Sequence, residues 1–276
     1  MKKLLSLALC VVLLTLSLTA CNNGAATADG DGPVRVRVGA TPRPHAEILS
    51  YIAPFLLEDG ILLEIVEFTE FGMVNPALAQ NQLEANFFQH MPFLENFTLQ
   101  TGNVLHVMGA IHIEPMGAYS MTLSDISQLP YNGLVAIPDC AVNGPRALLL
   151  MEQHGILNLD PDAGMRATVD NDIIDNPLSL RFIEIAPALL PRVLLANEAD
   201  LSIINTNHVL TGAPEINPLE DSLIMEYVEG SPYANMLVVR PEDADNPNMH
   251  TLLRHLQSDR VRQFILDNYY GVVPVF

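Results

Sequence analysis

Residues 134–155 read LVAIPDCAVNGPRALLLMEQHG and join a strand pattern directly to a helix pattern. The run 134–138 is short and apolar, which is typical of a buried strand. The helix expected over 143–155 has Asn143 as its cap, a proline in its first turn and a glycine at its end. A buried strand followed at once by such a helix indicates an α/β fold.

The same alternation continues on both sides of this unit. Strands are expected over 34–39, 62–68, 104–113, 117–120, 180–185, 201–205 and 236–240, and helices over 45–59, 76–83, 188–195 and 249–269. Strands that alternate with helices argue for βαβ units and a mainly parallel sheet. Two such units and a return strand indicate two lobes around a cleft, and ligands of open α/β sheets bind beyond the carboxyl ends of strands.

The N-terminal residues carry targeting signals. Two lysines precede an apolar stretch over 4–18, which is shorter than the roughly 20 residues that a membrane-spanning helix needs. The sequence LTAC that ends at Cys21 resembles a bacterial lipobox, in which cleavage precedes a cysteine that is then acylated. An ordinary signal peptide that happens to contain a cysteine is the alternative. The small and polar residues 22–33 predict a flexible tether.

These patterns divide the chain into consecutive parts. They are a lipoprotein signal peptide over 1–20, a flexible tether over 21–33, a first lobe over 34–120 plus 237–276, and a second lobe over 121–236. We expect the protein in the cell envelope, facing the periplasm or the outside of the cell. A lipid such as palmitate on Cys21 would hold it to the membrane.

The chain is strongly acidic. Its 276 residues include 32 Asp and Glu against 13 Lys and Arg, a formal net charge of −19. This charge argues against nucleic acid as a partner, because phosphate binding needs a basic surface. Of the three cysteines, Cys10 leaves with the signal peptide and Cys21 would carry lipid. Only Cys140 then remains, so no internal disulfide is expected.

Arg146 is the most informative single residue. It lies in the first turn of its helix, where a cation opposes the helix dipole and an anion is favoured. A ligand carboxylate could supply that anion, and a salt bridge to one of the many acids explains the residue equally well. Asn205 and Asn207 follow a strand pattern and Asn235 precedes one, so each can either present an amide to a ligand or form a turn.

The histidines raise the question of a metal site. His90, His106 and His112 lie within a short span, but the chain contains neither HExxH nor CxxC. A hydrolase is also poorly supported, since there is no GxSxG motif and no clear triad. We therefore expect no enzyme activity, no metal and no cofactor.

Several segments together resemble the methionine-binding lipoproteins of bacterial ABC importers, the NlpA-type family. They are VGATPRPHAEIL (38–49), EIVEFTEF (64–71), EANFFQHMPFL (84–94), HIEPMGAYS (112–120), NGPRALLL (143–150), INTN (204–207) and SPYANMLVVR (231–240). Each motif is weak alone, but their joint order over most of the chain is specific.

The resemblance implies a two-lobed fold of the periplasmic-binding-protein type II kind, with the ligand closed in the cleft between the lobes. It implies that Arg146 holds the ligand carboxylate and that aromatic rings enclose a thioether, since sulfur contacts aromatic edges favourably. Without the resemblance, the rings of ANFFQHMPFL (85–94) would be interpreted as a core cluster around a satisfied histidine. The implied ligand contacts are Phe71, Phe87, Phe88, His90, Asn143, Arg146, Asn205, Asn207 and Asn235.

The resemblance further implies a lipid-anchored protein that captures L-methionine and delivers it to an ABC permease and its ATPase. The alternative ligand is another small zwitterion: D-methionine, a methionine derivative, a Met-containing dipeptide or another apolar amino acid. The alternative class is a surface interaction protein that has lost its ligand. The chain departs from the family pattern at positions that bear on affinity and ligand identity, namely Arg43, Phe71, Pro145 and His208.

Overall fold

The computed structural model describes residues 32–276. Within them, Val34–Phe276 form one compact unit. The signal peptide expected over 1–20, the lipidation of Cys21 and nearly all of the tether lie outside the described residues. Among residues 32–276, every helix is too short or too polar to cross a membrane.

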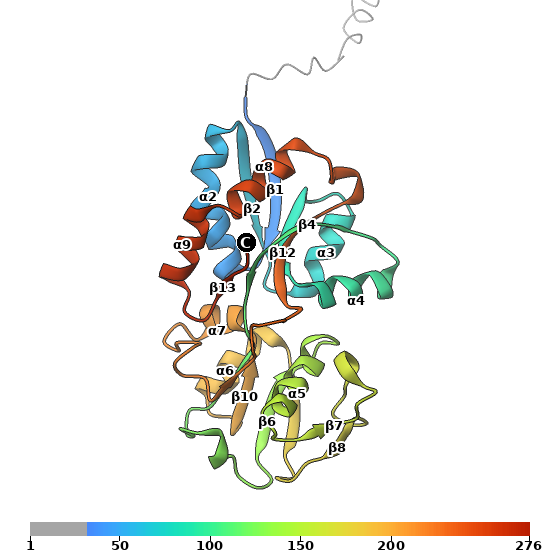
Figure 1. The fold of residues 1–276 in the computed structure, drawn as a ribbon, viewed down its shortest axis with the longest axis vertical. Helices are drawn as coiled ribbons and strands as arrows, with labels where there is room; N and C mark the ends of the chain where they lie inside the picture. The colour runs from blue at the N-terminus through green and yellow to red at the C-terminus, as the bar shows by residue number, and fades with distance from the viewer. Residues whose placement is uncertain (1–31) are drawn as a thin grey trace, which may run out of the picture. The chain divides into compact units, whose positions relative to one another are not determined.

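One large sheet is built from strands at both ends of this unit (Figure 1). Its strands are β1 Val34–Ala40, β2 Ile61–Glu67, β3 Ala85–Gln89, β4 His106–Ile113, β12 Ala234–Val239 and β13 Val273–Pro274. Their order is β13-β4-β12-β3-β1-β2. β1 is parallel to β2 and β3, whereas β12 is antiparallel to β3 and β4. We call this the first sheet.

The first sheet is covered on both faces, because side chains alternate between the two sides of each strand. On one face lie the helices α2 Glu47–Glu58, α8 Pro247–Leu256 and α9 Asp259–Asn268, and on the other lie α3 Phe71–Ala79 and α4 Met91–Thr101. In β12, Leu237 and Val239 enter the core beneath the first group, and Met236 and Val238 enter the core beneath the second. The strand is therefore apolar at every one of these positions.

The second sheet is built from the middle of the chain. Its strands are β5 Gly117–Tyr119, β6 Leu134–Pro138, β9 Arg181–Ile185, β10 Leu201–Ile204 and β11 Ile224–Met225, in the order β11-β5-β10-β6-β9. Helix α5 Asn143–Gln153 packs on one face, and α6 Leu190–Leu195 and α7 Thr206–Gly212 pack on the other. The small strands β7 Asn158–Leu159 and β8 Ile173–Asp175 pair with each other. Short helical turns occupy Pro42–Ala46 (η1), Ile126–Gln128 (η2), Gly164–Arg166 (η3), Pro187–Leu189 (η4) and Pro241–Asp243 (η5).

Both sheets are mainly parallel, as expected, because β1, β2, β3 and β4 share one direction in the first sheet and β6, β9, β10 and β11 share one in the second. The strands that run against them are β5, β12 and β13. β12 brings the chain back into the first sheet and inserts antiparallel between β3 and β4. β5 takes the chain into the second sheet and runs antiparallel to β10. Each crossing between the sheets adds an antiparallel strand. The crossings also fall a few residues away from the lobe boundaries expected after residues 120 and 236.

Two helix ends differ from the expectation. The single helix expected over 249–269 is two helices, because Ser258 has an extended backbone and starts α9 as its N-cap residue. Asn143 is the first residue of α5, and Val142, which holds the cap position, makes no capping hydrogen bond through its side chain. The Asn143 amide is therefore available for other contacts.

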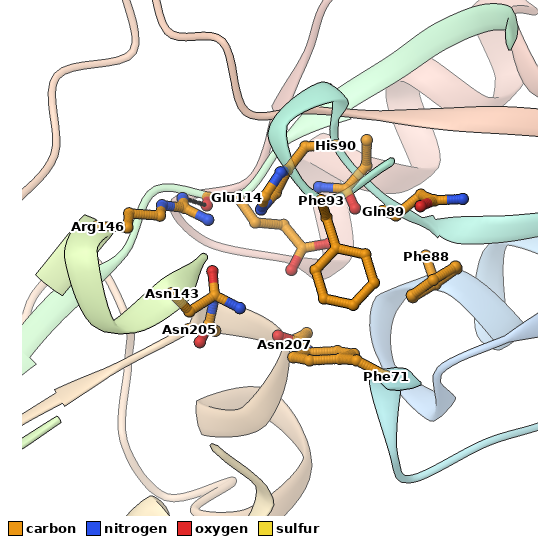
Figure 2. A pocket seen from close by; sticks show the side chains of 11 residues that line it. Phe71, Phe88, Gln89, His90, Phe93, Glu114, Asn143, Arg146, Asn205 and Asn207 are labelled. Carbon is orange, nitrogen blue, oxygen red and sulfur yellow. Dashed lines mark hydrogen bonds between the residues drawn. The ribbon is translucent and has the colours of Figure 1, made fainter. Parts of the chain in front are cut away.

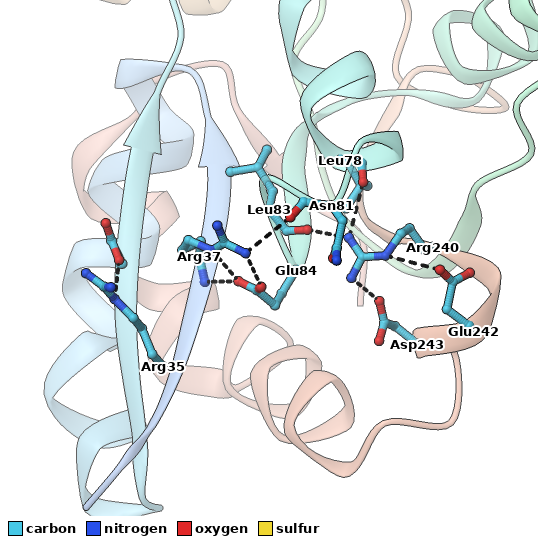
Figure 3. Close-up of polar contacts among 10 residues, drawn as sticks. Arg35, Arg37, Leu78, Asn81, Leu83, Glu84, Arg240, Glu242 and Asp243 are labelled. Carbon is cyan, nitrogen blue, oxygen red and sulfur yellow. Dashed lines mark hydrogen bonds and ion pairs between the residues drawn. The ribbon is translucent and has the colours of Figure 1, made fainter. Parts of the chain in front are cut away.

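Arginines hold the segment that connects α3 to β3 (Figure 3). Arg240 is buried and donates hydrogen bonds to the carbonyl oxygens of Leu78, at 3.1 Å, and Leu83. Leu78 lies in the last turn of α3, where the negative end of the helix dipole also favours a cation. Arg37 forms a two-pronged pair with Glu84, at 3.0 and 2.6 Å. These contacts fix the position at which β3 begins.

We expect Arg240→Gln to lower the free energy of unfolding by about 2–4 kcal/mol, because the two carbonyl oxygens and the carboxylate of Asp243, which also pairs with Arg240, lose their donor. Urea unfolding followed by circular dichroism measures this loss. Arg35→Gln is the matched control: Arg35 pairs with Glu64 on the surface, and such pairs contribute only about 0–1 kcal/mol. Equal losses in the two variants would contradict the assignment.

Candidate functional site

Elements of both sheets line one cavity (Figure 2). Its walls are formed by Phe71, Phe88, Gln89, His90, Phe93, Glu114, Asn143, Arg146, Asn205, Asn207 and Asn235. The space between these walls is about 360 Å³, part of it open to solvent. Most of these residues stand at or just beyond strand ends, as expected for an α/β fold. Of the ligand contacts expected from the sequence, the structure brings all except Phe87 to this cavity.

One end of the cavity is aromatic. Phe71 begins α3, Phe88 lies in β3, and Phe93 lies in the first turn of α4. Their ring centroids are 6.2 Å apart for Phe71 and Phe88, 6.0 Å for Phe71 and Phe93, and 5.6 Å for Phe88 and Phe93. The three rings form an apolar compartment of the kind that suits an aliphatic or thioether side chain.

Phe87 lies outside the cavity, contrary to the expectation. It is fully buried in the core beneath α2, where its ring meets the rings of His45 and His112 at 4.8 and 5.4 Å. Phe87 and Phe88 are neighbours on β3, so their side chains must point to opposite faces. Only one of the pair can face a ligand, and that residue is Phe88.

The other end of the cavity carries Arg146, which is almost fully buried (Figure 2). Its Nε and Nη2 donate to the two carboxylate oxygens of Glu226, at 2.8 and 2.6 Å. Nη2 also donates to the backbone oxygen of Glu114, at 2.9 Å, and Tyr233 lies under the guanidinium, 3.9 Å from Cζ to the ring centroid. Within residues 32–276, Nη1 has no hydrogen-bond partner. Arg146 thus has a salt bridge and still keeps one terminal nitrogen free.

Glu114 places a buried carboxylate at the wall of the cavity. Its Oε1 lies 2.6 Å from His112 Nε2 and 3.1 Å from His45 Nε2. Burial lowers the pKa of His45 to about 4 and that of His112 to about 3, so both imidazoles are neutral at pH 7. His45 Nε2 faces two acceptors, Asn235 Oδ1 at 3.1 Å and Glu114 Oε1, so Nε2 carries the proton and Nδ1 accepts from the Thr41 hydroxyl, at 2.7 Å.

The Glu114 carboxyl is subject to opposing influences. Burial raises its pKa, and nearby His45 and Arg146 oppose this rise without cancelling it. Glu114 and the two histidines could in principle hold a metal, since their ligand-type atoms lie within 4.8 Å of one another. The short nitrogen–oxygen distances are those of hydrogen bonds, and we assign the cluster to hydrogen bonding.

The cavity wall also carries acceptors that have no partner. Asn143 Oδ1 and Asn205 Oδ1 are buried, and neither receives a hydrogen bond from any described residue. Asn205 holds the N-cap position of α7 without using its side chain there. An unsatisfied buried polar atom costs about 1–3 kcal/mol. Such atoms at a cavity wall therefore mark the place where a ligand brings N–H donors.

Sequence reasoning missed Gln89, Phe93 and Glu114. Glu114 directly follows β4, so the rule that ligands bind beyond strand ends could have found it. Phe93 belongs to the segment ANFFQHMPFL (85–94), but only the start of α4 within that segment turns its ring towards Phe88. Gln89 is bound through its side chain to Asn75 and Asn86, which holds it in place at the cavity wall.

The fold and this cavity together define an α/β substrate-binding protein of the periplasmic type. The model of the NlpA lipoprotein family matches residues 36–276, and the chain belongs to this family.

Relatives and solved structures agree with this assignment. The methionine-binding lipoprotein MetQ of Bacillus subtilis is 34% identical over 279 residues, which cover 100% of this chain and 99% of that protein. A nutrient binding protein from Burkholderia cenocepacia, solved bound to methionine, is 34% identical with a TM-score of 0.83, over 87% of this chain and 100% of that one. An ABC transporter periplasmic substrate-binding protein from Coxiella burnetii is 31% identical with a TM-score of 0.81, over 87% and 100%.

One of the positions expected to depart from the family pattern, His208, lies beside the cavity. The ring of His208 packs on Phe71 at 4.8 Å, and its Nε2 is buried without a partner among residues 32–276. Arg43 Nη1 donates to the carbonyl oxygen of Leu210, at 3.1 Å. This contact links the loop after β1, beside the first sheet, to α7, beside the second.

His208 gives a pH-dependent prediction. Burial lowers its pKa from 6.5 to about 4, so between these pH values the unfolded chain binds a proton that the folded chain does not. The resulting stability is present above pH 6.5 and is lost as the pH falls towards 4. When the pH falls from 6.5 to 5, we expect the free energy of unfolding of the wild type to fall by about 2 kcal/mol more than that of His208→Phe, since one pKa unit is about 1.4 kcal/mol.

Urea unfolding at pH 7 and pH 5 measures this effect. His208→Leu, which packs differently but also lacks a titrating group, should show the same pH dependence as His208→Phe. If both variants lose stability with pH as steeply as the wild type, His208 does not carry the effect.

Proposed function

We propose that this protein captures methionine outside the cytoplasmic membrane and delivers it to an ABC transporter. The observation that carries the proposal is the division of the cavity into an aromatic end and a polar end that has an arginine and unsatisfied acceptors. A small zwitterion with an apolar side chain matches both ends. The relative named as methionine-binding and the similar structure bound to methionine support this ligand.

The polar end can bind the α-ammonium group through acceptors. An ammonium has three N–H donors, and Asn143 Oδ1, Asn205 Oδ1 and the Glu114 carboxylate offer three acceptors around the same space. Glu114 adds a negative charge, which strengthens such a hydrogen bond. A ligand without a free amino group would leave these acceptors unpaired and would bind weakly.

We assign the α-carboxylate of the ligand to the side chain of Arg146. Backbone amides at the N-terminus of α5 are already occupied: Gly144 N donates to Cys140 O, and Asn143 N donates to Cys140 Sγ. Pro145 has no N–H. The helix end therefore offers little to an anion, and the free Nη1 of Arg146 is the charged donor that the cavity wall offers to the carboxylate.

We propose that each sheet with its helices forms one lobe, with boundaries at the crossings between β4 and β5 and between β11 and β12. A ligand that touches residues from both lobes favours the closed arrangement by its differential affinity. The function needs no covalent chemistry, metal or cofactor. After cleavage of the signal peptide, lipid on Cys21 would anchor the protein, and the permease with its ATPase would receive the ligand.

Calorimetric titration with L-methionine tests the proposal. We expect saturable binding by the wild type and a loss of about 30-fold or more in Arg146→Ala, because removing one partner of a buried charged pair costs about 2–5 kcal/mol. Arg146→Lys, which keeps the charge but loses the planar fork, should lie between the two. If the protein is purified with a ligand already bound, mass spectrometry of the molecule released on denaturation identifies that ligand.

Two outcomes would overturn parts of this proposal. A flat titration with L-methionine, together with release of a different small molecule, would keep the binding class and replace the ligand. Unchanged methionine affinity in a folded Arg146→Ala variant would remove the carboxylate assignment.

The neighbouring phenylalanines give a matched pair of variants. Phe88→Ala should weaken methionine binding about tenfold or more, because it opens the aromatic compartment. Phe87→Ala should instead lower the free energy of unfolding by about 3–5 kcal/mol, because it leaves a cavity in the core. Titration and urea unfolding of both variants separate the two effects, and a larger affinity loss in Phe87→Ala would refute the assignment of Phe88.

A further inference from the structure

Glu226 lies just outside the cavity but controls the residue that faces it. Its two carboxylate oxygens occupy the Nε and Nη2 edge of Arg146, at 2.8 and 2.6 Å. Glu226 is itself fixed by the backbone of Met116: Met116 N donates to Oε2 at 2.7 Å, and Glu226 N donates to Met116 O at 3.0 Å. The carboxylate is thus held by the end of the second sheet rather than by solvent.

The remaining sides of the Arg146 guanidinium are also occupied. Tyr233 covers one face of the plane, and the ring of His90 meets Tyr233 edge-on at 5.0 Å. Glu114 O takes a second hydrogen from Nη2. The plane of the guanidinium is therefore fixed, and Nη1 is the one terminal nitrogen left for a ligand, within residues 32–276.

Glu226 has two opposite effects on an incoming carboxylate. Its charge neutralises Arg146 and so weakens the attraction for a second anion. Its geometry holds Arg146 in place, and a buried cation without a partner would cost several kcal/mol. A second, surface cavity lies behind this pair and is lined by Glu152, Glu226 and Glu229. An Arg146 released from Glu226 would find water and acids on that side.

We propose that Glu226 is the positioning residue for recognition of the ligand carboxylate: it holds Arg146 so that Nη1 faces the cavity. The orienting effect exceeds the charge competition, because the alternative for Arg146 is to turn away from the ligand. The orientation of Arg146 stands on the contacts alone, and its consequence for affinity rests on the proposed function.

The orientation is tested without any ligand. Arginine Nε–H signals in ¹H–¹⁵N spectra report a guanidinium that is held by a buried carboxylate, and Arg146→Lys identifies the Arg146 signal. We expect a slowly exchanging signal in the wild type and its loss or fast exchange in Glu226→Gln. Glu229→Gln is the matched control, since it removes an exposed acid from the same segment. An unchanged Arg146 signal in Glu226→Gln would overturn the proposal.

The consequence for binding is tested with L-methionine and L-methioninol, which has a hydroxymethyl group in place of the carboxylate. Glu226→Gln should lose about tenfold or more in methionine affinity and less than about threefold in methioninol affinity, so that the preference between them shrinks. Equal losses would show a merely structural role, and tighter methionine binding would show that charge competition dominates. Either result overturns the proposal.

Two further measurements keep the outcomes distinct. Thermal unfolding shows whether Glu226→Gln is folded. If it is not, Glu226→Asp replaces it and should show the same selective, smaller loss for methionine. If the wild type binds neither compound, the proposed function fails, while the spectra still decide the orientation of Arg146.

Discussion

A buried guanidinium must have an anion and several acceptors around it, and Arg146 obtains them from segments far apart in the chain. It starts in α5, meets the crossing between β4 and β5 at Glu114, and meets the residue after β11 at Glu226. Both crossings between the sheets therefore converge on one side chain. The cavity exists at this place because the chain passes from sheet to sheet here.

Strand β3 shows how closely the core and the site are connected. Every side chain of β3 is buried, and each is either apolar or an amide. Phe87 lies in the core and Phe88 lies at the cavity. Arg37 and Arg240 fix the start of β3, and Gln89 at its end is bound by Asn75 and Asn86. The aromatic compartment thus stands on a strand that is held along its length, so this end of the cavity is preformed.

The sequence predicted the elements well where a periodic pattern was long, as in α5 and β6. Strand–helix alternation also predicted the mainly parallel order, but it takes no account of the antiparallel strands at the crossings, β5 and β12. Alternation along β3 could have removed Phe87 from the candidate site. Nothing in the sequence could pair Glu226 with Arg146, since only the fold brings these distant residues together. Without that pairing, the sequence could not decide between a salt bridge and a ligand carboxylate as the partner of Arg146.

Arg146 and Glu226 are largely buried and neutralise each other's charge, so the pair adds no net charge to the wall of the cavity. Salt screens charges that are exposed to water much more than charges that are buried. A zwitterion also carries no net charge for the −19 of the chain to attract or repel at long range. Capture of such a ligand should therefore proceed at similar rates in dilute and in saline surroundings.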